Sequence, residues 1–194
     1  NDGALVSNTA ATTVTILGSG GRPVLDLDAN DSSGATLTGY LTTFTENGSA
    51  VAIADTDVVI TDNNSTIMNG ATITLTNAQV GDVLAVGSMP TDITASVVGN
   101  VVTLSGNATI ANYQTAIRSV TFANTSENPS ATPRIITVTV SDLGGGPGNV
   151  ATTTINVLPV NDSPVLDLDS NNSSGATGTG YKTTFIKNGT PVAV

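Results

Sequence analysis

The chain contains two copies of one stretch of sequence. Residues 163–194 repeat residues 22–53 at an offset of 141 positions without a gap, and 22 of the 32 aligned residues are identical. The segment 8–16 aligns with 149–157 at the same offset. A repeat of this size is one structural module, and tandem modules form arrays that supply length, rigidity or multivalent binding. We therefore expect residues 1–21 to hold the last strands of one repeat, 22–162 a complete repeat, and 163–194 the first part of the next.

The charge balance narrows the class of function. Fifteen acidic residues stand against five basic ones, and the net charge is −10. Such a surface repels nucleic acid and anionic membranes and attracts cations, although acids also serve simply to keep a protein soluble. No apolar run is long enough to insert into a bilayer.

Catalysis has little support in the composition. The chain has no His and no Cys, which excludes Ser-His and Cys-His nucleophiles. Three Tyr, three Phe and no Trp offer no aromatic-walled cleft of the kind that glycosidases use. We expect a protein that is not an enzyme.

Strand and turn signals predict the fold. Apolar runs that are rich in Thr and Val alternate with Gly, Asn, Asp and Pro, which favour turns. The expected strands are 11–17, 42–54 with a turn at Asn47-Gly48, 57–61, 71–77, 83–87, 93–99, 100–106, 119–124, 134–142 and 150–158. This pattern predicts an all-β fold, an antiparallel β-sandwich.

One segment has a different period. Ile110, Tyr113 and Ile117 recur at helical spacing, which predicts one short helical segment over 108–118. We interpret Tyr113 as a core anchor in preference to a ligand platform.

The acids gather near strand ends, in part as D-x-D pairs. Two carboxylates on one side of an extended chain repel unless solvent or a cation screens them. Calcium prefers many hard oxygen ligands in irregular loops, and zinc prefers His and Cys, which are missing. We predict calcium ligands at Glu46, Asp55, Asp57, Asp142 and Asp162, with a carbonyl from Asn161. For each Asp the alternative is an Asx turn, and for Asp26 and Asp28 we favour a solvated strand face.

Three short motifs carry a family resemblance. PVNDSP (159–164) resembles the junction of cadherin-like repeats, TENG (45–48) resembles an acidic element near the start of a cadherin domain, and ADTD (54–57) resembles a ligand pair. The wider text is similar to the long repeats of giant bacterial surface adhesins of the cadherin-like or RTX type. The resemblance implies an Ig-like or cadherin-like sandwich, calcium at loops and junctions, an extracellular location at the bacterial surface, and a spacer or adhesive role.

Partners and alternatives follow from the same text. The expected partners are neighbouring repeats or identical subunits, and a surface glycan or host-matrix ligand. Lys187 replaces Glu46 in the second copy, and the linker 18–23 has no acid, which predicts calcium at some junctions only. One alternative is a carbohydrate- or ice-binding module that uses outward Thr in 71–77 and 152–156. Another is a filament subunit that assembles by strand complementation between copies.

Overall fold

The chain divides into two compact units, one ending at Val160 and the other beginning at Asn161. The computed structural model describes residues 21–192. The strand expected at 11–17, and with it the end of a preceding repeat, lies outside the described residues.

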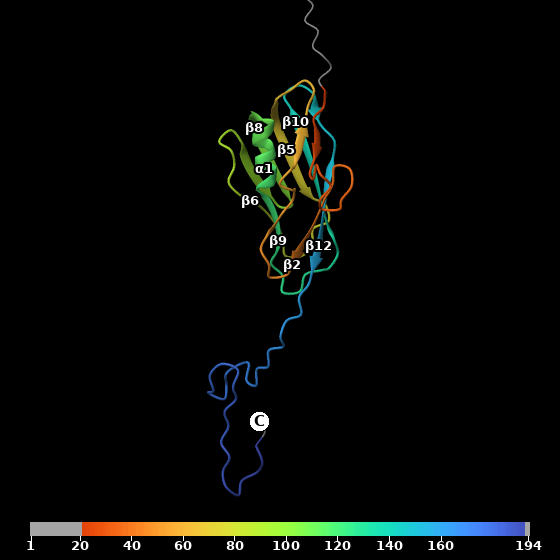
Figure 1. Ribbon diagram of the computed structural model, residues 1–194. Coiled ribbons are helices and arrows are strands. Elements are labelled where there is room, and N and C mark those ends of the chain that lie inside the picture. The colour runs from red at the N-terminus through yellow and green to blue at the C-terminus, as the bar shows by residue number, and fades with distance from the viewer. Residues whose placement is uncertain (1–20, 193–194) are drawn as a thin grey trace, which may run out of the picture. The chain divides into compact units, whose positions relative to one another are not determined.

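The first unit is a sandwich of β-sheets (Figure 1). The larger sheet has seven strands in the order β2 (Tyr40–Thr45), β12 (Ala151–Leu158), β10 (Arg134–Asp142), β5 (Ile67–Leu75), β8 (Val101–Thr109) and β7 (Thr94–Val98), with β11 (Gly146–Pro147) paired to β10. The smaller sheet has the order β3 (Val51–Ala52), β9 (Val120–Asn124) and β6 (Asp82–Val86), and a two-stranded ribbon joins β1 (Val24–Asp26) to β4 (Val59–Thr61). Every pairing is antiparallel except that of β2 with β12. The predicted all-β sandwich is confirmed.

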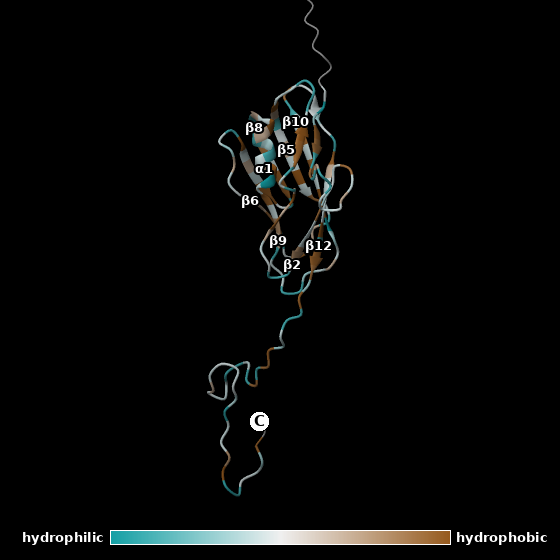
Figure 2. Cartoon of the chain, in the orientation of Figure 1, coloured by the Kyte–Doolittle hydropathy of each residue, from teal (hydrophilic) through white to brown (hydrophobic). Residues whose placement is uncertain are grey.

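The core follows from the alternation of apolar and polar residues along the strands. In β10, Ile136, Val138 and Val140 are fully buried, whereas Thr137 and Thr139 between them are only half-buried. Figure 2 shows apolar residues concentrated on the strands of this unit and hydrophilic residues on its loops. Phe44 of β2 meets Phe122 of β9 edge to face, with ring centroids 5.7 Å apart, so the two larger sheets pack directly against each other.

The predicted helical segment is α1 (Ile110–Arg118), which connects β8 to β9 and so joins the two larger sheets. It begins at 110 and not at 108 because residues 108 and 109 complete the pairing of β8 with β5. The side chain of Thr109 caps the helix by accepting a hydrogen bond from the Asn112 amide at 3.2 Å. Tyr113 is fully buried and donates to the Gly106 carbonyl at 2.7 Å, which confirms its place in the core. Burial raises its pKa to about 12, so the hydroxyl stays protonated.

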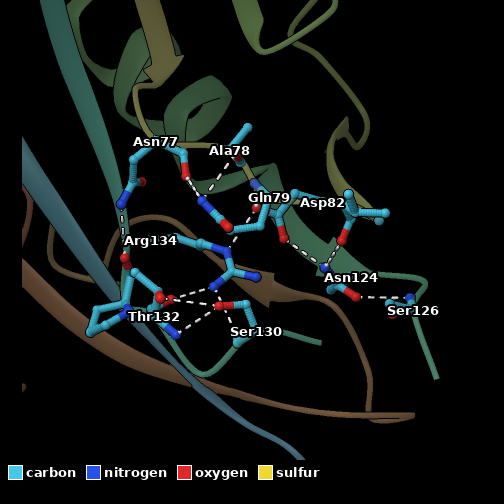
Figure 3. A network of polar contacts seen from close by, with 12 residues as sticks. Asn77, Ala78, Gln79, Asp82, Asn124, Ser126, Ser130, Thr132 and Arg134 are labelled. Carbon is cyan, nitrogen blue, oxygen red and sulfur yellow. Dashed lines mark hydrogen bonds and ion pairs between the residues drawn. The ribbon is translucent and has the colours of Figure 1, made fainter. Parts of the chain in front are cut away.

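A buried ion pair links β10 to β6. Arg134 Nε donates to Asp82 Oδ2 at 2.7 Å, and both side chains are inaccessible to solvent. Arg134 Nη1 also donates to the Ser130 carbonyl at 2.8 Å, and Asp82 Oδ1 accepts from Asn124 Nδ2 at 2.7 Å (Figure 3). This network holds the connection between β9 and β10 against the start of β6.

The described part of the second unit, residues 161–192, contains no strand. It corresponds in sequence to the region of β1, β2 and the start of β3, whose partners in the first unit are β4, β12 and β9. The strands β4, β12 and β9 all follow residue 51 of the first repeat. The second unit therefore lacks the residues that would correspond to them. The apolar counterpart of Phe44, which is Phe185, is accordingly 62% exposed.

Candidate cation-binding sites

The turn after β1 is organised by the carboxylate of Asp28. Asp28 Oδ1 accepts a hydrogen bond from the Ser32 amide at 3.1 Å, and Oδ2 accepts from the Ser33 amide at 2.8 Å. The Ser32 hydroxyl is 3.3 Å from Oδ1. Burial acts to raise the pKa of Asp28, but the hydrogen bonds from Ser33 and Ser32 outweigh it and hold the pKa below its ordinary value of 3.8. The group is therefore an anion at neutral pH, although it is fully buried.

This turn forms from local sequence. In the second unit Asp169 accepts from the Ser173 amide at 3.1 Å and from the Ser174 amide at 2.8 Å, which are the same contacts at the same spacing. Hydrogen bonds from Ser174 and Ser173 likewise outweigh burial and lower the pKa of Asp169. The turn needs no β-sandwich around it, because its contacts span at most five residues.

The first unit brings two more carboxylates to this turn. The Asp55 amide donates to the Leu27 carbonyl at 2.9 Å, which places the loop between β3 and β4 beside the turn. The Ser32 hydroxyl donates to Asp55 Oδ2 at 3.0 Å, and the Asn30 amide donates to Asp57 Oδ2 at 3.1 Å. One carboxylate oxygen from each of Asp28, Asp55 and Asp57 lies within 4.8 Å of the others. We call these three residues the Asp28 cluster.

The Asp28 cluster carries a concentrated negative charge. Two unit charges 4.8 Å apart repel by about 3.5 kcal/mol at an effective dielectric constant of ~20, and the cluster has three such pairs. Arg118 approaches this region, but its guanidinium donates to the Thr56 carbonyl at 2.9 Å and not to a carboxylate. Among residues 21–192 the one ion pair is that of Arg134 with Asp82.

Two carboxylates of the cluster have distinct environments. Hydrogen bonds from the Thr56 amide and hydroxyl lower the pKa of Asp55 and outweigh the opposing effects of burial and of the Asp28 charge. Asp57 Oδ1 is buried and accepts no hydrogen bond within the described chain. An anionic oxygen without a partner inside a group of three carboxylates suits a hard cation.

Glu46 lies elsewhere, at the end of β2. It is 4% exposed, its Oε2 accepts from the Val160 amide at 2.7 Å, and its amide donates to the Leu158 carbonyl at 3.0 Å. Its Oε1 is buried without a hydrogen-bond partner in the described residues, and an oxygen of Glu127 lies within 4.8 Å of a Glu46 oxygen. Glu46 and Glu127 form a second, smaller group of acids.

Asp142 is at the opposite end of the large sheet from Glu46. Asp142 is the last residue of β10, which runs antiparallel to β12, so it lies near the start of β12. Glu46 directly follows Thr45 of β2, and Thr45 pairs with Leu158, the last residue of β12. Asn161 and Asp162 belong to the second unit, where the Asn161 side chain donates to the Asp162 carbonyl at 3.3 Å. The structure thus joins Asp55 with Asp57, and it places Glu46 and Asp142 apart from them and from each other.

Two acids of these groups did not emerge from the sequence as ligands. The expectation of a solvated strand face for Asp28 is wrong, because the chain turns directly after Asp26 and points the Asp28 carboxylate inward at Ser32 and Ser33. The sequence pattern that could have identified the role of Asp28 is D-x-x-x-S-S, which both copies share. Glu127 stands in a polar stretch, and no pattern in the sequence sets it apart.

Comparison with protein-family models, with curated proteins and with solved structures finds no match for this chain. No helix among the described residues is long and apolar enough to cross a membrane.

Proposed function

We propose that the chain is a structural repeat of an extracellular surface protein, and that calcium stiffens it by binding the Asp28 cluster. The observation that supports this most directly is the convergence of Asp28, Asp55 and Asp57, with a buried Asp57 oxygen that lacks a partner. The tandem repetition and the sandwich fold support the role of a spacer in an array.

Calcium is the cation that fits this donor set best. The donors are carboxylate oxygens on irregular loops, and the chain has no His and no Cys to supply imidazole or thiolate ligands. Magnesium requires near-ideal octahedral geometry and keeps several waters, whereas calcium accepts six to eight oxygens in flexible arrangements. Backbone carbonyls and water would complete the shell around the three acids.

Binding would join parts of the sequence that are distant along the chain. Asp28 belongs to the turn after β1, whereas Asp55 and Asp57 precede β4, the strand that pairs with β1. A cation held by all three would therefore lock the β1–β4 ribbon and remove the repulsion among the acids. At a free concentration 100 times the dissociation constant, binding adds about 2.7 kcal/mol to the free energy of unfolding.

Thermal unfolding with and without calcium tests this proposal. We expect the melting temperature to rise with added calcium and to fall when a chelator is added. The double variant Asp55→Asn with Asp57→Asn should lose most of that response. Asp92→Asn is the matched control, because Asp92 is exposed and outside every acidic group described above. An equal response to calcium in the double variant and the wild type would reject the Asp28 cluster as the site.

The spacer role has its own test. Small-angle scattering of a chain with two complete repeats should give a longer and narrower distance distribution in calcium than in chelator. An unchanged distribution, together with a calcium-dependent melting temperature, would keep the cation site and reject its role in stiffening the array.

A second candidate function is recognition of a flat, hydroxyl-rich surface such as a polysaccharide or ice. The observation in its favour is that Thr side chains line up across the outer face of the large sheet in register. Thr152 stands opposite Thr137, which stands opposite Thr74, and Thr139 stands opposite Thr72, which stands opposite Thr103. Such rows repeat at about 4.8 Å across strands and about 6.8 Å along them. Loss of binding to a glycan array or to ice in Thr137→Lys, with the fold intact, would support it, whereas wild-type protein that binds neither would reject it.

A further inference from the structure

The outer edge of β7 has no partner strand among residues 21–192. The strand ends the large sheet and pairs there with β8, to which a two-residue turn at Gly99-Asn100 joins it. In such a hairpin the residues next to the turn, and every second residue from them, hydrogen-bond across to the other strand. The backbone amides and carbonyls of Ala95 and Val97 therefore point away from β8, and no other segment of the described chain pairs with them.

The core-facing side of this edge is also open to solvent. Val97 stands opposite Val102 of β8, and Ala95 stands opposite Leu104, so the four side chains share one face of the sheet. Val102 and Leu104 are fully buried, whereas Val97 is 42% exposed. On the other face Val98 is 73% exposed. The edge thus combines unpaired backbone groups with apolar side chains that water reaches.

The opposite edge of the large sheet is covered. That edge is β2, where the Leu41 amide donates to the Ser33 hydroxyl at 3.0 Å, so the turn organised by Asp28 lies against it. Proteins protect exposed edge strands with proline, charged side chains, bulges or a covering loop. Strand β7 has the sequence TASVV, and its pairing with β8 has no irregularity. It is therefore the unprotected edge of this sheet.

The distribution of charge indicates which partner fits this edge. Two molecules of a chain with a net charge of −10 repel each other over most of their surface. Residues 93–117 contain no charged side chain, and they include β7, its turn, β8 and most of α1. A second molecule of the same chain can approach here without opposing like charges. An edge strand is also complementary to itself, because two antiparallel copies related by a twofold axis match each outward amide with a carbonyl.

We propose that β7 pairs antiparallel with β7 of a second molecule, about a twofold axis at Ser96. In this register the outward backbone groups of Ala95 bond to those of Val97 in the second molecule, and Val97 loses much of its exposure. Asp92, the nearest acid in the sequence, lies opposite Asn100 of the second molecule. The two Asp92 side chains are then separated by roughly 25 Å of strand, well beyond the Debye length of ~8 Å in physiological salt.

This contact joins two molecules and no more, because it uses the open edge of each large sheet. It requires neither calcium nor the spacer role. A five-residue edge makes a small and weak interface on its own. If the chain is a repeat of an array, as proposed above, several such contacts in parallel would hold two arrays side by side through avidity.

Sedimentation velocity and amide hydrogen exchange of the full chain test the pairing, from ~10 μM to ~1 mM protein. We expect the weight-average sedimentation coefficient to rise with concentration. The amides of Ala95 and Val97 should exchange more slowly as the concentration rises, because they become hydrogen-bonded between molecules. The Ser96 amide, which already lies within the hairpin, should show no such change.

Substitutions at Val97 separate this edge from other surfaces. Val97→Pro removes one outward amide and leaves the pairing with β8 intact, and Val97→Lys places a charge on the edge. Both variants should stay monomeric over the whole range, and Val97→Lys decides the case if Val97→Pro does not fold. Val97→Thr keeps the amide and the branched shape and should associate like the wild type. Val80→Lys is the matched control, because it adds the same charge at a loop residue that is 89% exposed.

A wild type that stays monomeric to ~1 mM, with fast exchange at Ala95 and Val97, would overturn the proposal. Association that persists in Val97→Pro and Val97→Lys would overturn it too, and this is the result expected if calcium bridges acids of two molecules. Slower exchange over 181–186 together with β7 would show that the second unit of another molecule occupies the edge instead. Loss of association at Val97 alone supports the pairing, whether or not the melting temperature responds to calcium.

Discussion

The buried ion pair of Arg134 with Asp82 offers the sharpest test of how the sandwich is held together. The Asp82→Ala substitution removes the acceptor of three donors at once: Arg134 Nε at 2.7 Å, the Gln79 amide at 2.7 Å and Asn124 Nδ2 at 2.7 Å. Asn124 Nδ2 keeps a second acceptor in the Val80 carbonyl at 3.0 Å, but Arg134 Nε and the Gln79 amide have no other acceptor in the described structure. Figure 3 shows that these groups converge on the one carboxylate.

The expected loss is large because the guanidinium stays buried without its counter-charge. Both side chains are inaccessible to solvent, and breaking one partner of such a pair costs about 3–5 kcal/mol. For a domain of this size each kcal/mol lowers the melting temperature by about 2–4 °C, so Asp82→Ala should melt roughly 6–20 °C below the wild type. Replacing both partners with apolar residues, as in Asp82→Leu with Arg134→Met, should recover most of that loss because no charge is then buried.

Urea denaturation of the wild type, of Asp82→Leu, of Arg134→Met and of the double variant that combines these two substitutions gives the coupling free energy directly. We expect the sum of the unfolding free energies lost in the two single variants to exceed the loss in the double variant by at least ~2 kcal/mol. The difference should also be the same in low and high salt, because a buried pair is weakly screened. Additive losses, or an Asp82→Ala loss below ~1 kcal/mol, would refute the conclusion that this pair holds β6 to β10.

Three further predictions concern single positions. Leu37 is 85% exposed and has a φ of 64°, and the equivalent residue of the second copy is Gly178, with a φ of 63°. Because glycine adopts this conformation without strain, Leu37→Gly should raise the free energy of unfolding by about 0.5–1 kcal/mol in urea denaturation. A lower free energy of unfolding would show that the Leu37 side chain makes a stabilising contact. Thr109 caps α1, so Thr109→Ala should lower the free energy of unfolding by about 1 kcal/mol, and Thr109→Ser should retain most of the stability. The stability of each variant is measured by circular-dichroism melting. A melting temperature for Thr109→Ser no higher than that for Thr109→Ala would exclude the cap. The lowered pKa of Asp28 means that the folded state favours the anion, so this contribution to stability is complete above the ordinary value of 3.8 and is lost as the pH falls through the lower folded-state pKa. The stability difference between the wild type and Asp28→Asn, measured by urea denaturation in chelator, should therefore shrink on acidification below pH 3.8, and a difference that grows there would reverse the sign.

Much of the fold could be read from local patterns. Alternation in 134–142 and 71–77 identified β10 and most of β5, because a strand with one face in the core must place apolar side chains at every second residue. Helical spacing of Ile110, Tyr113 and Ile117 identified α1 for the corresponding reason. The short strands β1 and β11 escaped prediction, since three and two residues carry no period.

The sequence by itself determined the repeat, the strands with strong alternation, and the turn around Asp28. That turn forms in both units because its hydrogen bonds join residues no more than five apart. Only the tertiary structure decided which acids meet. Asp57 reaches the turn across 27 residues through its bond with Asn30, and Asp55 reaches it across 23 residues through its bond with Ser32. Strand pairing fixes these approaches, and burial then decides which carboxylate oxygens lose water. The spacing of the acids along the chain predicts neither the strand pairing nor the burial.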